Sequence, residues 1–152
     1  MKKLLLIILF LIPNLAFSLP ETLNQYISKN PTWNSTDMAS LSYITSRCAL
    51  LTFVISEQYK NQTDTQAKEL YKLTQTRATT FTVFSDAIYK ANGGSTKDFQ
   101  DRAKTWAKLY GEEGVSNINI YGTFIRGDIA SDLTTCGEQV LPLMEIMLEQ
   151  AN

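Results

Sequence analysis

The chain has 152 residues and a formal net charge of −1; hydrophobic residues make up 44% of it, and it has no histidine. This length is enough for one domain with one hydrophobic core. The missing histidine excludes His-based acid/base catalysis, Ser-His-Asp and Cys-His nucleophile pairs, and His-ligated zinc or haem sites. Lysines and arginines are scattered without a basic run, so we predict no binding to nucleic acid.

The first 18 residues, MKKLLLIILFLIPNLAFS, have the pattern of a secretory signal peptide. Lys2 and Lys3 precede an apolar run from Leu4 to Ile12, and small residues stand before a cleavage point after position 18. The run is much shorter than the roughly 20 residues that span a bilayer as a helix. We therefore predict a cleaved signal peptide at 1–18 and a single domain at 19–152 that does not span the membrane and is periplasmic or secreted. A retained membrane anchor is the alternative.

The rest of the chain has helical periodicity almost throughout. A short helix is expected over 21–29, and the first long helix over 37–60, with Ser35 or Thr36 as its cap. Apolar residues recur in this long helix at three- and four-residue spacing, and its centre is apolar on most sides. Such a helix is expected to lie at the centre of its bundle.

Two further long helices follow. One is predicted over 63–91, beginning with a capping box at Thr63. The next begins with a second capping box at Ser95 and is expected to end at Gly111 to Gly114.

The region 115–152 is less uniform. Its apolar spacing favours a helix, although residues 115–121 are also compatible with a short strand. Gly137 and Pro142 are expected to bend or break the helix. Short loops between long helices predict an all-α, up-down antiparallel bundle of about four main helices plus short terminal helices.

The two cysteines fall near the middle of the first and the last long helices. The first and last helices of a four-helix bundle are usually neighbours, so Cys48 and Cys136 can meet. In an exported protein the surroundings are oxidising. We therefore predict one disulfide across the bundle, Cys48–Cys136.

Charged residues accompany both cysteines. Arg47 precedes Cys48, Asp132 and Asp128 lie one and two turns before Cys136, and Arg77 interrupts the apolar face of the second long helix. A buried arginine needs a carboxylate or carbonyl partner, because an unpaired buried charge is very costly. Two interpretations stay open: an internal ion pair that fixes helix register, or a polar pocket that holds an anionic or hydrogen-bonding ligand. The candidate residues are Arg47, Arg77, Asp128 and Asp132.

Two short segments, SRCALL at 46–51 and DLTTC at 132–136, pair an early Arg-Cys with a late Asp-x-x-x-Cys. This pairing resembles small exported helical proteins of marine bacteria and their phages, which are largely uncharacterised. The resemblance implies the same disulfide and adds weight to Arg47 and Asp132. It implies no activity.

The sequence has no catalytic constellation, so we do not expect an enzyme, and we predict no cofactor and no metal. We expect a protein of the cell envelope that acts through protein–protein interaction, as an inhibitor, accessory or chaperone-like factor. Its partner is expected to be another envelope or secreted protein. The alternative is a carrier that binds a small anionic or amphipathic molecule in the bundle interior, where several aromatic side chains are expected.

Overall fold

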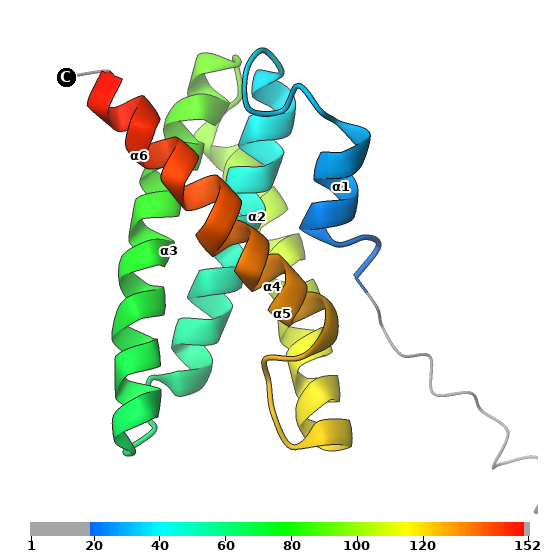
Figure 1. The fold of residues 1–152 in the computed structure, drawn as a ribbon, viewed down its shortest axis with the longest axis vertical. Coiled ribbons are helices and arrows are strands. Elements are labelled where there is room, and N and C mark those ends of the chain that lie inside the picture. Colours follow the sequence, from blue (N-terminus) through cyan, green and yellow to red (C-terminus); the bar gives the residue numbers. More distant parts are fainter. Residues whose placement is uncertain (1–18, 151–152) are drawn as a thin grey trace, which may run out of the picture.

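The computed structural model describes residues 19–150, and this part of the chain is helical without strands (Figure 1). The predicted signal peptide lies outside the described residues. The helices are α1 (Leu23–Lys29), α2 (Met38–Tyr59), α3 (Thr65–Ala91), α4 (Thr96–Tyr121), α5 (Gly127–Thr135), the π-helical turn η2 (Cys136–Val140) and α6 (Leu141–Gln150). The all-α prediction is confirmed, and the strand alternative at 115–121 is wrong because those residues complete α4.

Helix α2 is the central element. It contacts α3, α4, α5 and η2, and about half of its residues are buried, including Ile44, Leu51 and Ile55. By length and composition α2 could also cross a membrane, but 61% of its most apolar window is buried within the fold. Burial of this extent is what a core helix of a bundle shows.

The long helices alternate in direction. α2 and α3 form an antiparallel pair, α4 returns behind them, and the segment from α5 to α6 crosses obliquely in front (Figure 1). This is the predicted up-down bundle, with the short α1 against α5. Its core gathers apolar residues from the helices and from the segments that flank them, including Leu19, Trp33 and Phe124.

The disulfide Cys48–Cys136 joins the middle of α2 to the first residue of η2, as predicted. The two Cα atoms are 5.5 Å apart, and neither cysteine is more than 1% exposed. Disulfides persist in oxidising compartments, so this bond indicates a non-cytoplasmic environment.

The last helical segment is continuous from α5 through η2 to α6. After α5 the chain makes one π turn, in which the Leu141 N–H binds the Cys136 carbonyl, and continues as α6. Pro142 has no N–H to donate, and it directly follows this π turn, where the hydrogen-bond pattern of the helix already changes. A break at Gly137 and Pro142 was one of the predicted outcomes and is wrong: the helix type changes there for one π turn, and the chain stays helical.

The predicted caps at Ser35 or Thr36 and at Thr63 are wrong by one or two residues. Asp37 caps α2, accepting from a backbone N–H at 2.9 Å, and Asp64 caps α3 in the same way at 2.8 Å. A carboxylate both accepts this hydrogen bond and interacts favourably with the positive end of the helix dipole.

Helix α4 begins at the predicted cap, Ser95, but it continues through both glycines that were expected to end it. The helix ends at Gly122, which has a φ of 74° and adopts the left-handed conformation that favours glycine. Gly114 has a packing role, because a Cβ there would overlap the ring of Phe124. Gly111 faces open space.

These two glycines give a matched pair of substitutions. Gly111→Ala is expected to raise the free energy of unfolding by about 0.5–1 kcal/mol, since alanine is the better helix former. Gly114→Ala is expected to lower it by about 1–3 kcal/mol, because the clash with Phe124 outweighs the same gain. Urea unfolding of both variants measures the difference, and equal changes would contradict the packing role of Gly114.

Candidate functional site

The charged side chain predicted at the core stands in the middle of α2. Arg47 is 0% exposed, and its guanidinium makes four hydrogen bonds. Nη2 donates to Asp132 Oδ2 at 2.6 Å and to the Glu21 carbonyl at 3.0 Å. Nε donates to Tyr110 Oη at 3.0 Å, and Nη1 donates to Tyr43 Oη at 3.2 Å. The charge is therefore held by groups from α2, α4, α5 and the segment before α1.

Asp132 completes the site from α5. Its Oδ2 also accepts from Tyr110 Oη at 2.6 Å, and its Oδ1 accepts from the Leu23 backbone N–H at 2.6 Å. Leu23 is the first residue of α1, and an N–H at this position has no partner within its own helix. The buried carboxylate therefore binds the start of α1 as well as Arg47.

Aromatic rings enclose the guanidinium. Its Cζ lies 4.3 Å from the centroid of the Trp106 ring, and 5.6 and 5.7 Å from those of Tyr43 and Tyr110. A cation over an aromatic face is stabilised, most strongly where water is excluded. We call Arg47, Asp132, Tyr110, Tyr43 and Trp106 the core polar cluster.

Burial and pairing act in opposite directions on the groups of this cluster. Burial lowers the pKa of Arg47, but Tyr110 and Asp132 outweigh it and raise that pKa above its ordinary value. Burial raises the pKa of Asp132, against the effect of Arg47. Burial raises the pKa of Tyr110 well above 10. Tyr110 therefore keeps its proton, and its hydroxyl group donates a hydrogen bond to Asp132.

The structure brings together two of the four candidate charged residues, Arg47 and Asp132. Arg77 is on α3 and is not a hydrogen-bond partner of Asp132. Its side chain approaches η2, where a Cβ on Gly137 would be 3.5 Å from Arg77 Nη1. Asp128 is in the first turn of α5, and together with burial it raises the pKa of Glu113. Of the two open interpretations, this geometry is that of an internal ion pair.

Sequence reasoning did not find the other members of the cluster. Trp106 and Tyr110 lie four residues apart on one face of the third long helix, and this spacing favours core packing, with the lining of a ligand cavity as the alternative. The spacing was the available sequence signal, because it places Tyr110 on the core side of its helix. A tyrosine hydroxyl there can bind both a buried arginine and a buried aspartate. The backbone groups of Glu21 and Leu23 leave no signal in the sequence.

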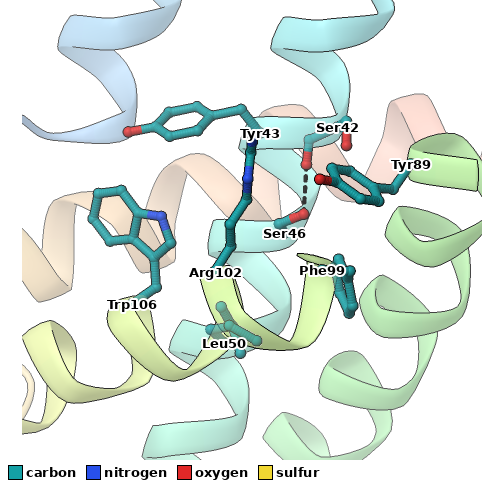
Figure 2. Close-up of a pocket in the computed structure, with 9 residues that line it drawn as sticks. Ser42, Tyr43, Ser46, Leu50, Tyr89, Phe99, Arg102 and Trp106 are labelled. Atoms are coloured by element: carbon teal, nitrogen blue, oxygen red, sulfur yellow. Dashed lines mark hydrogen bonds between the residues drawn. The ribbon is translucent and has the colours of Figure 1, made fainter. Parts of the chain in front are cut away.

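A small cavity adjoins the cluster between α2, α3 and α4 (Figure 2). Its volume is about 20 Å³, room for one water molecule. Arg102 reaches between the aromatic walls, with its Cζ 5.5 Å from the Tyr89 ring centroid, and Ser46 Oγ donates to the Ser42 carbonyl at 2.6 Å. The cavity is lined by Ser42, Tyr43, Ser46, Leu50, Tyr89, Phe99, Arg102, Ala103 and Trp106.

Within residues 19–150, no group of three or more Cys, Asp or Glu side chains is arranged to hold a metal ion. Comparisons of the chain with protein-family models, curated proteins and solved structures find no match. The resemblance to small exported proteins of marine bacteria and phages therefore stays a prediction.

The buried ion pair is expected to be strongly coupled. Arg47→Met and Asp132→Asn should each lower the free energy of unfolding by about 3–5 kcal/mol, because each leaves the other charge buried without its partner. In the double variant, the loss in the free energy of unfolding should be smaller than the sum of the two single losses by at least about 2 kcal/mol. Urea unfolding of the four proteins measures this coupling.

The exposed pair Lys97–Asp101 supplies the control for that cycle. Its side chains are 81% and 51% exposed. Lys97→Met and Asp101→Asn should therefore change stability by no more than about 0.5 kcal/mol each. Additive losses at Arg47 and Asp132 would contradict the ion pair.

Tyr110 is expected to make the fold sensitive to alkali. Since its pKa is higher in the folded chain than in the unfolded one, its contribution is fully present below about pH 10 and is lost as the pH rises above that value. The Tyr110→Phe variant should have a lower free energy of unfolding at pH 8 than the unsubstituted protein. Between about pH 10 and pH 12, its free energy of unfolding should decrease less steeply.

Urea unfolding at several pH values measures this slope. Tyr121→Phe is the control, because Tyr121 is 53% exposed and lies outside the core polar cluster. The control should keep the slope of the unsubstituted protein. The same slope in Tyr110→Phe would show that Tyr110 does not carry the effect.

Proposed function

We propose that this is an exported, non-catalytic protein of the cell envelope that acts by binding another envelope or secreted protein. The disulfide supports a place outside the cytoplasm. The signal-peptide pattern of residues 1–18 supports export to the periplasm or beyond. Inhibitor, accessory and chaperone-like roles are all consistent with such a protein.

One observation carries the proposal: apolar side chains stand exposed at a groove between α2 and α3. Phe53 is 48% exposed and Val83 is 68% exposed, and both line this groove of about 330 Å³. Its other lining residues are small or polar, among them Ala78, Thr79 and Thr82. Large apolar side chains beside small residues suit a partner whose own apolar side chains fill the space between them.

The carrier alternative is less well supported by the interior. A ligand at Arg47 would have to replace hydrogen bonds to Asp132, Tyr110, Tyr43 and the Glu21 carbonyl. The cavity at Arg102 is the size of one water molecule. Binding at the surface requires neither the loss of these hydrogen bonds nor a larger cavity.

A photo-reactive amino acid at position 83 tests the proposal. In the periplasmic and secreted fractions of cells that carry the gene, it should cross-link to one defined protein, because Val83 lies at the groove. Position 115 on α4 is the matched control, since Val115 is also an exposed valine, at 54%, and lies outside the groove. No cross-link at 83, or the same products at both positions, would contradict the proposal.

A further inference from the structure

A second cleft, separate from the α2–α3 groove, lies at one end of the bundle. The α2–α3 turn and the α4–α5 turn lie at this same end (Figure 1). Between them is a cleft of about 440 Å³, bounded by the end of α2, the start of α3 and the end of α4. Pockets that bind small molecules have volumes of about 300–1,000 Å³. We call it the end cleft.

Three glutamines supply most of the polar groups of the end cleft. Gln58 is on α2, Gln62 is in the turn and Gln66 is on α3. Among the described residues, none of these three side chains has a hydrogen-bond partner. A side-chain amide has two donor hydrogens and an acceptor oxygen, so each glutamine can bind a hydroxyl group in either direction. Thr123 adds a hydroxyl group, which can also donate or accept a hydrogen bond.

Apolar side chains supply the walls. Tyr59, Leu70 and Ile118 line the cleft, and Ile118 is 36% exposed. Burial and the nearby Asp64 raise the pKa of Tyr59, so its ring presents a neutral surface. Such walls suit the C–H faces of a ring that carries its polar groups around the edge.

The charge of the end cleft limits the class of ligand. No lysine or arginine lines it, so an anionic group would find no cation there. The one charged residue is Asp64, which would repel an anion and whose Oδ1 accepts from the Ala67 N–H. A ligand that matches the cleft is therefore neutral, rich in hydroxyl groups and partly apolar.

We propose that the end cleft binds a neutral saccharide, with the amides of Gln58, Gln62 and Gln66 on its hydroxyl groups and Tyr59 and Ile118 on its ring faces. This goes beyond the proposed function, since the groove at Val83 and the end cleft share no residue. The two proposals can therefore fail separately.

Saturation-transfer difference NMR on the full chain without its signal peptide tests the proposal. The neutral probes are the trisaccharides of N-acetylglucosamine and of β-1,4-linked glucose, and the trisaccharide of galacturonic acid is the anionic probe. At least one neutral probe should bind with a dissociation constant below about 10 mM, and the anionic probe should bind at least tenfold more weakly. Absence of binding by both neutral probes, or preference for the anionic one, would overturn the proposal.

Substitutions locate the binding. Gln62→Leu and Gln66→Leu should each weaken it about fivefold, the loss expected for one hydrogen bond. Thr123→Trp, which fills the cleft, should weaken it at least tenfold by the same readout. Gln75→Leu is the control, because Gln75 is an exposed glutamine of α3 that lies in the other groove. Binding that survives all three cleft variants, or falls equally in the control, would place the saccharide elsewhere and overturn the proposal.

Discussion

A guanidinium group that has lost all contact with solvent must have its charge and its donors satisfied by the protein. Arg47 meets this requirement with Tyr110 from α4, Asp132 from α5 and the Glu21 carbonyl before α1, in addition to Tyr43 from its own helix. Each partner lies on a different segment, so the positions of these segments relative to α2 are fixed by one charge. The disulfide adds a second link one residue further along α2, from Cys48 to the first residue of η2, which directly follows α5.

The same requirement shapes where the protein can bind something else. The side chains of the core polar cluster already bind one another, and the adjoining cavity holds no more than a water molecule. Space for a partner or ligand is found instead at the edges of the bundle, in the α2–α3 groove and in the end cleft. Both proposals therefore place binding at the edges of the bundle, one for a protein and one for a saccharide.

The helical periodicity and the cysteine spacing were sufficient to predict the fold class, the antiparallel arrangement and the disulfide. The proximity of Arg47 and Asp132 followed from the disulfide, since both residues lie within a turn of a cysteine. The errors of the sequence-based prediction were local. Gly111 and Gly114 predicted the end of a helix, because glycine is common there, but the helix continues and Phe124 packs on Gly114. Contacts through backbone groups, such as the Leu23 N–H, depend on the tertiary structure and have no sequence signal.

Amide hydrogen exchange at Leu23 tests most directly whether the buried ion pair organises the fold. Leu23 is the first residue of a seven-residue helix, where an amide normally exchanges quickly because it has no partner within its helix. The 2.6 Å hydrogen bond to Asp132 predicts protection comparable to that of buried α2 amides such as Ile44, and loss of that protection in Arg47→Met. Fast exchange at Leu23 in the unsubstituted protein would contradict the account.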